Sequence, residues 1–360
     1  MNDTALLSIA EPALVREVFE RTAHFVPSNA LTAVTELSPQ ALRILAREGF
    51  ALPPVLASAS GPEHLRVRRI VAKFFSPAKV GAVAQSIRDI ARSSARLSAD
   101  QLATQGQSDL AGTVAADVPP RIMGTLLGVV LPDQRLLKIW SRDSLELFWG
   151  WPDQERQQQL AQSAAQFYAW LRDSVRHAQG QQNLWGVLGA AGVPEREICS
   201  LGYFLLIAGQ ETTCLLIQTV LYRALRDPAI WEACARGSQD AAHNFVRRVL
   251  ATESSVHTWR RAVTEDTELG PHTLPAGAEI LLELSGEHLA TDPYGHKLAF
   301  GHGLHRCLGA RLAEMEAVIA LEETARALPD PAALAVTECP ESRWLRLLSF
   351  QAPLKVEVQS

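Results

Sequence analysis

One stretch of the chain is more informative than any other: Phe300-Gly301-His302-Gly303-Leu304-His305-Arg306-Cys307-Leu308-Gly309. It leads into a segment, Gly309 to Leu328, in which apolar residues alternate with Arg and Glu at helical spacing before Pro329. A cysteine just before a helix N-terminus feels the positive end of the helix dipole, which favours thiolate over thiol. Glycines on both sides let the backbone approach a flat ligand and donate N–H groups to the sulfur. Cys307 is therefore expected to be a thiolate that could ligate haem iron.

The spacing within residues 300–309 resembles the haem-binding signature of the cytochromes P450, F-x-x-G-x-H-x-C-x-G. The matching positions are Phe300, Gly303, His305, Cys307 and Gly309. The resemblance implies haem b as cofactor, Cys307 as the iron ligand, the other four as cofactor-binding residues, and His305 on a haem propionate. The structural alternative is a buried cysteine in a glycine-rich turn.

A second segment lies in the middle of a long apolar stretch, Glu197 to Arg226, which predicts a central helix ending before Pro228. It reads Ala208-Gly209-Gln210-Glu211-Thr212-Thr213. An ionisable Glu211 among leucines is costly unless it has a function. The segment resembles the A-G-x-E/D-T motif of the same family, which implies that Thr212 hydrogen-bonds the dioxygen co-substrate, that Glu211 relays protons, and that Gly209 opens the helix beside the iron. The alternative is a kinked helix in which the threonine bonds its own i−4 carbonyl.

His64 and Arg68 are four residues apart, so they share one face of a predicted helix, where two cationic donors suit a carboxylate. They resemble the pair on the family's C-helix that binds one haem propionate. Arg261 resembles the strand arginine that binds the other propionate. The resemblance as a whole covers residues 25–328, and the N-terminus looks trimmed beside the family.

Five further basic residues allow two interpretations: Arg66, Arg69, Lys73, Arg306 and Arg311. They could form a solvated basic face or a docking patch for an acidic electron-transfer partner. No complete G-x-G-x-x-G motif is present, so direct binding of a nicotinamide cofactor is not expected. The resemblance implies a ferredoxin and a ferredoxin reductase as electron donors, with peroxide as the alternative oxidant.

The chain departs from the family in two linked ways. The E-x-x-R motif is absent, since the two possible registers read Asn244 to Arg247 and Arg248 to Ala251, and the second fits the following segment better. The block that normally precedes the cysteine loop is shortened. A buried glutamate and arginine without their third partner would form an unsatisfied charge network, so loss of all three is less harmful than loss of one.

Composition predicts an ordinary globular protein. The chain has 360 residues, of which 47% are hydrophobic and 20% charged. The expected fold class is mainly α with a minor β portion (α+β), as a single P450-like domain spanning 1–360. We predict a helix over 154–177, strands over 261–269 and 280–284, and a C-terminal strand pair formed by 344–350 and 354–358.

Several classes of protein are not expected. A net charge of −5 argues against a nucleic-acid binder. The absence of an 18-residue apolar run and of a basic leader predicts a cytoplasmic protein without a membrane anchor. Five cysteines without a CxxC pair predict neither a disulfide framework nor a zinc cluster. An H-x-x-H pair, His302 and His305, leaves zinc as a weaker alternative.

The resulting functional hypothesis is a haem-thiolate monooxygenase that hydroxylates or epoxidises a complex natural-product intermediate in secondary metabolism of the antibiotic type. Two alternatives remain open: a haem enzyme of another type, such as a peroxide-driven oxidase, and a P450-shaped recruitment module without chemistry. Five residues form an aromatic-rich region, which the resemblance to the family implies is a lid over the substrate, each with helix packing as its alternative: Trp140, Phe148, Trp149, Trp151 and Trp170.

Overall fold

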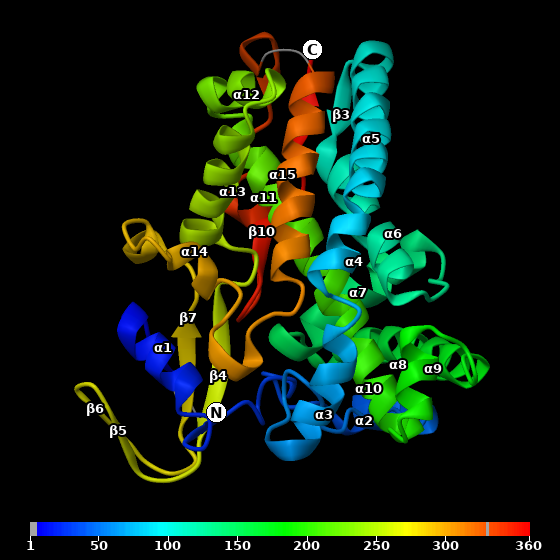
Figure 1. Ribbon diagram of the computed structural model, residues 1–360, viewed down its shortest axis with the longest axis vertical. Coiled ribbons are helices and arrows are strands. Elements are labelled where there is room, and N and C mark those ends of the chain that lie inside the picture. Colours follow the sequence, from blue (N-terminus) through cyan, green and yellow to red (C-terminus); the bar gives the residue numbers. More distant parts are fainter. Residues whose placement is uncertain (1–5, 329–330) are drawn as a thin grey trace.

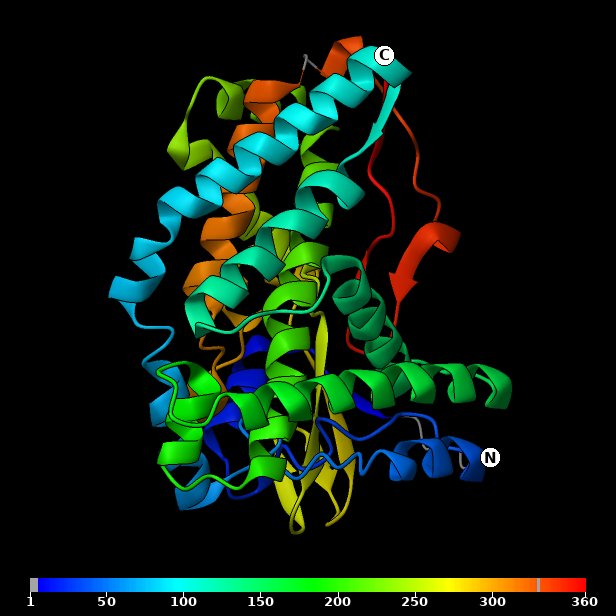
Figure 2. The same cartoon turned by 90° about the vertical axis from the view of Figure 1, so that its right-hand side faces the viewer.

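The computed structural model describes residues 6–328 and 331–360, in which long helices pack against one another and four small sheets are distributed among them, the largest at the lower left of Figure 1. This confirms the expected class, mainly α with a minor β portion. Figure 2 shows the helix α8 (Gln154–His177) crossing the lower half of the molecule almost at right angles to the vertical helix bundle. The interpretation of residues 1–360 as a single domain stays a prediction.

The remaining helices include π-helical and 3₁₀ turns, which are written η. In chain order they are α1 (Pro12–Glu20), α2 (Pro39–Arg47), α3 (Gly61–Ala72), α4 (Pro77–Ala82), α5 (Ala84–Gln105), η1 (Ala111–Ala115), α6 (Ala116–Leu127), α7 (Gln134–Trp149), α9 (Leu184–Ala190), α10 (Glu195–Leu206), η2 (Ile207–Glu211), α11 (Thr212–Ala224), α12 (Pro228–Ala235), α13 (Gln239–Glu253), η3 (Glu287–Leu289), α14 (Gly295–Leu298), η4 (Gly303–His305), α15 (Ala310–Ala327), η5 (Pro331–Ala333) and η6 (Glu341–Arg343).

The strands are short. They are β1 (Leu7–Ile9), β2 (Phe25–Val26), β3 (Gln107–Asp109), β4 (Thr258–Val263), β5 (Thr267–Leu269), β6 (His272–Leu274), β7 (Glu279–Glu283), β8 (Ala335–Val336), β9 (Trp344–Arg346), β10 (Gln351–Pro353) and β11 (Glu357–Gln359). The largest sheet has the order β1-β7-β4-β2, with β1 parallel to β7 and the other pairs antiparallel. In it Arg261 lies opposite Ile280, which fixes the arginine at the centre of the sheet.

The sequence predicts a minority of these elements, and it is most accurate for the long helices. The helix over 154–177 is confirmed to the residue as α8, and the expected helix over 309–328 is α15. The strand expected over 261–269 is two strands, β4 and β5, separated by a turn. The predicted pairing of 344–350 with 354–358 is wrong. The chain turns at Leu347, whose N–H donates to the carbonyl oxygen of Phe350, so β9 pairs with β10, while β11 pairs with β3 and β8.

The central helix is confirmed but is not a regular α-helix. It runs through α10, η2 and α11, and the π-helical turn η2 covers the Gly209–Glu211 motif. π-turns inside α-helices widen the helix locally and occur frequently at functional sites. Among the described residues this run, Glu195–Ala224, is long and apolar enough to cross a membrane by length and composition, and 72% of its most apolar window is buried inside the molecule. Packing in the core therefore accounts for its apolar surface.

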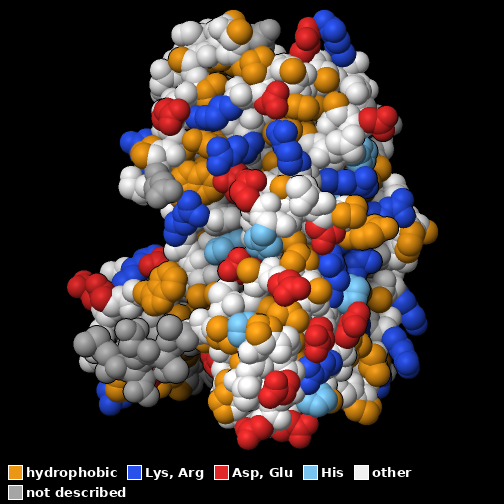
Figure 3. Space-filling model, turned by 90° about the vertical axis from the view of Figure 1, so that its left-hand side faces the viewer, with side chains coloured by type: hydrophobic (Ala, Val, Ile, Leu, Met, Phe, Trp, Pro, Cys, Tyr) orange, Lys and Arg blue, Asp and Glu red, His pale blue; other side chains and the backbone are white. Residues whose placement is uncertain are grey.

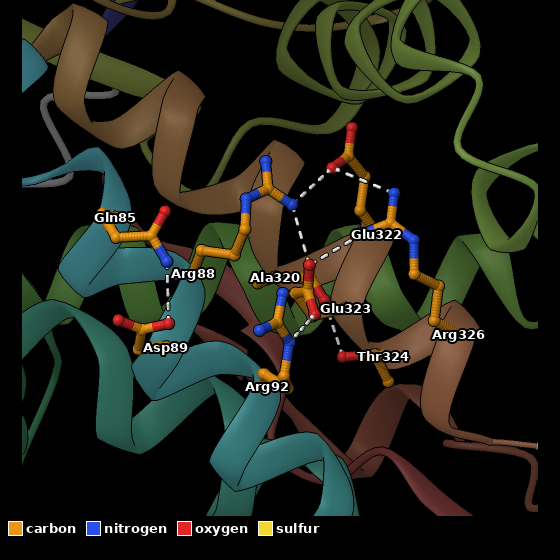
Figure 4. A network of polar contacts seen from close by, with 9 residues as sticks. All are labelled: Gln85, Arg88, Asp89, Arg92, Ala320, Glu322, Glu323, Thr324 and Arg326. Carbon is orange, nitrogen blue, oxygen red and sulfur yellow. Dashed lines mark hydrogen bonds and ion pairs between the residues drawn. The ribbon is translucent and has the colours of Figure 1, made fainter.

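A network of buried charges holds α15 against α5 (Figure 4). Glu322 and Glu323 on α15 are almost fully buried, and Arg88 on α5 donates to both, at 3.1 and 2.8 Å. Arg92, one turn further along α5, donates to Glu323 at 2.9 Å, and Arg326 closes the network from α15 itself at 2.7 Å. Because two arginines at i, i+4 present one face, α5 can satisfy both carboxylates. The network fixes the helix whose N-terminus follows the cysteine loop.

Candidate active site

A large cavity lies between the cysteine loop and the central helix. It has an empty volume of about 1480 Å³ and is lined mostly by apolar side chains. Of the residues singled out in the sequence, it is lined by Arg68, Gly209, Thr212, Arg261, Phe300, His305, Cys307 and Gly309. Glu211, His64 and Gly303 do not line it. The fold thus brings residues more than 200 positions apart in the sequence to one cavity.

Cys307 differs from the other four cysteines, which are buried, because it is exposed and lines the cavity. Its own N–H donates to the carbonyl oxygen of Phe300 at 2.8 Å, which closes the loop. Removal from bulk water raises the pKa of the Cys307 thiol, while the N–H groups of Gly309 and Ala310 and the charge of Arg68 lower it less. The helix terminus thus acts on the sulfur in the expected direction, while burial opposes it. The thiolate form of Cys307 stays a prediction.

Two glycines shape the loop around the sulfur. Gly301 and Gly303 have φ values of +68° and +62°, a left-handed conformation that other residues adopt at a cost. A Cβ atom at Gly303 would also lie 3.2 Å from the carbonyl oxygen of Phe19 in α1. This packing explains why a glycine stands four residues before Cys307, although Gly303 does not face the cavity.

Arg261 is a buried cation without an anion. Its side chain is 2% exposed, its Nη1 donates to the carbonyl oxygen of Arg260 at 2.8 Å, and its guanidinium lies 5.0 Å from the ring centroid of Phe19. No described carboxylate pairs with it, and burial lowers its pKa to about 10. An unpaired buried charge is strongly unfavourable, so an acidic ligand in the cavity would stabilise it.

His64 and His305 stack with 4.8 Å between their ring centroids. His305 Nε2 lies 2.9 Å from the carbonyl oxygen of Ala59, whereas both nitrogens of the buried His64 lack a partner within the described chain. Burial lowers the pKa of both, for His305 to about 4. His64 therefore packs against His305, which lines the cavity, and does not line the cavity itself.

The other resemblance-based cation is Arg68. It is half-buried, it lines the cavity, and it donates to the carbonyl oxygen of Arg306. Burial lowers its pKa, and the nearby Cys307 partly opposes that effect.

The two histidines of the H-x-x-H pair do not face a common site. His302 pairs with Glu20 at 3.0 Å on the surface, while His305 contacts the backbone. No group of three or more metal-binding side chains occurs in residues 6–328 and 331–360.

These residues fit an iron porphyrin. Its flat apolar ring suits the apolar lining, its iron suits the Cys307 sulfur at the cavity wall, and its propionates suit the unpaired Arg261 together with Arg68. The residues that could hold it are Cys307 at the iron, and Arg68, Arg261 and the His305–His64 stack at the carboxylates.

Glu211 is fully buried but points away from the cavity lining. Its carboxylate accepts a hydrogen bond from Lys138 Nζ at 2.5 Å, and Arg142 Nε lies 3.4 Å away. Both cations come from α7, four residues apart on one face. The sequence reasoning missed this pair, although two cations four residues apart were a usable signal.

Thr212 both bonds its own i−4 carbonyl oxygen and lines the cavity, so it fits the structural and the functional interpretation of the motif. Its hydroxyl donates to the carbonyl oxygen of Ala208 at 2.5 Å, and the residue also lines the cavity. Its own carbonyl oxygen accepts from the hydroxyl of Ser255 at 2.8 Å, which ties the central helix to the segment before β4. Gly209 has a packing reason as well, because a Cβ there would lie 2.3 Å from Met123 Cε.

The region without the E-x-x-R motif contains a different ion pair. Arg247 on α13 donates to Glu314 on α15 at 2.7 Å, and Arg248 is exposed, with Asp227 at 3.5 Å. Ala251 is buried and apolar, so within this helix's described side chains neither register holds a Glu–Arg pair. Figure 3 shows the face that carries α13 and α14, where acidic and basic side chains are intermingled.

The residues of the aromatic-rich region have different surroundings. Trp149 lines the cavity. Trp140 and Trp170 pack with Phe167 in the core, and Trp151 is 62% exposed. Two aromatic residues that the sequence reasoning missed, Trp259 and Phe350, line the cavity beside Trp149. Trp259 stands two residues before Arg261, which was a usable signal because alternate residues of a strand share a face.

The basic residues 66, 69, 73, 306 and 311 stay a predicted patch. Arg66 already has partners within the chain, since its guanidinium pairs with Glu63 and donates to the carbonyl oxygen of Ala191 at 2.8 Å.

The chain is similar in sequence to curated bacterial enzymes and in structure to solved cytochromes P450. No protein-family model matches the chain. It is 29% identical over 301 residues to the cytochrome P450 monooxygenase PikC of Streptomyces venezuelae (78% of this chain, 70% of that protein). It is 30% identical over 287 residues to the cyclomarin C epoxidase CymV of Salinispora arenicola (74% of this chain, 71% of that protein). Among solved structures, cytochrome P450 CREJ in complex with (4-ethylphenyl) dihydrogen phosphate matches with a TM-score of 0.87 at 28% identity, covering 98% of this chain and 91% of that chain.

Proposed function

Because this chain belongs to the cytochrome P450 family of bacterial monooxygenases, we propose that it hydroxylates or epoxidises a complex natural-product intermediate in secondary metabolism of the antibiotic type. One observation carries the proposal: Cys307, the unpaired Arg261 and Thr212 face the same apolar cavity. The substrate class is supported by CymV, whose name gives it as an epoxidase of cyclomarin C.

The cofactor in this proposal is haem b, with dioxygen as co-substrate. Cys307 ligates the iron, and Arg68, Arg261 and the His305–His64 stack hold the propionates. Phe300, Gly303 and Gly309 give the loop its shape, since Phe300 accepts the hydrogen bond from the Cys307 N–H and Gly309 directs its own N–H to the sulfur. When bound, haem supplies the electron transfer and the oxygen activation that monooxygenation requires.

The central helix supplies protons and orientation. The buried Glu211 carboxylate is paired with Lys138 and Arg142, so proton exchange with it would run from the α7 side. Thr212 holds a hydroxyl proton at the cavity wall, at present directed to Ala208, and rotation about its Cα–Cβ bond would redirect that proton into the cavity. The π-turn that carries Gly209 ends at Glu211, so Glu211 and Thr212 are adjacent where the π-turn meets α11.

Electrons come from a partner protein in this proposal. The partner is a ferredoxin reduced by a ferredoxin reductase, and the basic residues 66, 69, 73, 306 and 311 form its docking patch. The corresponding location is the cytoplasm.

The test is the absorption spectrum of the purified protein, reduced and exposed to carbon monoxide. We expect the red-shifted Soret band of a thiolate-ligated haem, and we expect Cys307→Ser to abolish it. Cys199→Ser is the matched control, since Cys199 is buried outside the cavity. A protein that binds no haem even with haem precursor supplied during expression, or a Cys307→Ser variant with an unchanged band, would overturn the proposal.

A further inference from the structure

The cavity has an aromatic wall made of Trp149, Trp259 and Phe350, which come from three separate segments. The ring centroids of Trp149 and Trp259 are 6.1 Å apart with 32° between the planes. Phe350 stands nearly perpendicular to both, at 5.0 Å from Trp149 and 6.3 Å from Trp259. Rings at these distances contact one another, so the three form one continuous apolar surface.

Backbone hydrogen bonds hold this aromatic wall in place. The N–H of Leu348 donates to the carbonyl oxygen of Trp149 at 2.9 Å, and the N–H of His257 donates to that of Ser349 at 3.1 Å. Phe350 also forms a β-bridge with Val256. The turn over 347–350 therefore joins the end of α7 to the start of β4, and the backbone of each of the three rings is held by the others' segments.

A glycine makes the position of Trp149 possible. Trp149 is the last residue of α7, and a Cβ atom on the next residue, Gly150, would lie 2.5 Å from the carbonyl oxygen of Glu146. The backbone oxygen cannot move away without unwinding the last helical turn. Only glycine lets the chain leave the helix here while Trp149 stays at the cavity.

The cavity offers a substrate almost no charge. No Asp or Glu of the described residues lines it, so a substrate amine would find no anion among them. Of its three arginines, Arg68 and Arg261 are assigned to the cofactor carboxylates, and Arg306 lies in the cysteine loop itself. Two of its hydroxyls, those of Thr212 and Ser255, already donate to backbone oxygens.

We infer that the Trp149–Trp259–Phe350 wall selects an uncharged substrate that presents a flat, unsaturated ring to it. The inference rests on the proposed function and deepens it by naming the part of the substrate that is recognised. Aromatic contacts contribute about 0.5–1.5 kcal/mol beyond burial of area, which corresponds to about 2- to 12-fold in affinity. A rigid wall gives this gain at low entropic cost because its side chains are already ordered.

The test uses four probes with one carbon skeleton, titrated calorimetrically into the purified protein after its haem content and its carbon monoxide spectrum have been recorded. They are 2-naphthylmethanol, its decahydro analogue, 2-naphthoate and 2-naphthylmethylammonium. We expect the aromatic alcohol to bind about 3- to 10-fold more tightly than the saturated one, and both charged probes to bind at least about 10-fold more weakly than the aromatic alcohol.

Variants separate ring recognition from simple volume. In Trp259→Leu and Phe350→Leu the ratio of aromatic to saturated affinity is expected to fall towards one, because the stacking surface is lost. Trp151→Leu is the matched control, since it removes an exposed indole two residues from Trp149, and the ratio should stay at the wild-type value.

An unchanged ratio in both wall variants, or tight binding of either charged probe, would overturn the inference. A thiolate-type spectrum together with such a result leaves the proposed function standing and removes the inference alone. A missing thiolate-type spectrum removes the proposed function, and the same titration of the haem-free protein then still reports whether the wall discriminates the ring.

Discussion

Glu211 and Lys138 form an ion pair of 2.5 Å in which the carboxylate has no exposed surface. Glu211 lies on the central helix and Lys138 on α7, so the pair joins the motif helix to a helix of the cavity wall. The cost of burying Glu211 is thus offset by a partner 73 residues earlier in the chain.

Removing the cation should be costly because it leaves a buried charge with one distant partner. We expect Lys138→Met to lower the free energy of unfolding by about 2–4 kcal/mol in a urea titration. Glu211→Gln combined with Lys138→Met should recover much of that loss. Arg236→Met, which removes one side of the exposed pair with Glu232, should cost less than about 1 kcal/mol. A loss of stability in Lys138→Met no larger than in Arg236→Met would contradict a buried pair.

Thr212→Ala should separate oxygen consumption from product formation, since the hydroxyl at the cavity wall is lost. Thr219→Ala is a close control: Thr219 lies on the same helix, is buried, and bonds its own i−4 carbonyl at 3.1 Å. Both variants should lose similar stability. Only Thr212→Ala should lower the ratio of product to oxygen consumed, and Thr212→Ser should restore part of it. Equal ratios in the two alanine variants would rule out the assigned role.

Glu323→Gln should weaken the packing of α15 on α5. The carboxylate is nearly fully buried and accepts hydrogen bonds from three arginines, two of which come from α5. We expect a loss of about 2–4 kcal/mol in the free energy of unfolding. The exposed Glu232→Gln should change it by less than about 1 kcal/mol. If the two substitutions cost the same, the network in Figure 4 does not stabilise the fold.

Acidification should destabilise the protein through His257. Burial and the charge of Arg346 lower its pKa from about 6.5 to about 4, partly opposed by Glu283. The unfolded state therefore binds more protons between these values, so this stabilisation is complete above pH 6.5 and is lost as the pH falls towards 4. The shift corresponds to about 3 kcal/mol at most.

The measurement is the unfolding free energy at pH 7 and pH 5. His257→Gln should make the protein less sensitive to this change, while replacement of the exposed His177 by Gln should not. Equal pH sensitivity in the wild type and in His257→Gln would show that His257 does not titrate in this range.

Local signals made much of the site predictable from sequence. Cys307, His305 and Phe300 lie in one loop with a recognisable spacing. Thr212 lies in a helical stretch where threonine is an unfavourable residue. Both signals can be recognised without knowing which distant segments meet. Arg261 was identified by its resemblance to the strand arginine of the family, and it does lie buried beside the cavity.

The remainder depends on which segments meet in space. The cations around Glu211 come from α7, and the aromatic wall combines residues 149, 259 and 350, which no sequence periodicity relates. The pairing of β9 with β10 depended on a turn at Leu347 that carries neither glycine nor proline, so the usual turn signal was missing. The thiol chemistry of Cys307 depended on how much surrounding protein removes it from water, which a helix-terminus argument does not contain.

The π-turn in the central helix has a consequence for insertions and deletions. Each residue of a helix advances it by about 100°, and a π-turn holds one residue more than the α-helical turn it replaces. Deletion of a single residue within Ile207–Glu211 would therefore leave an ordinary α-helical turn, and the two flanking helices, α10 and α11, would keep nearly their present rotation relative to each other. The same deletion inside α11 would rotate every later residue by about 100° around the helix axis. The π-turn is thus a place where the central helix can lose a residue while Thr212 still faces the cavity.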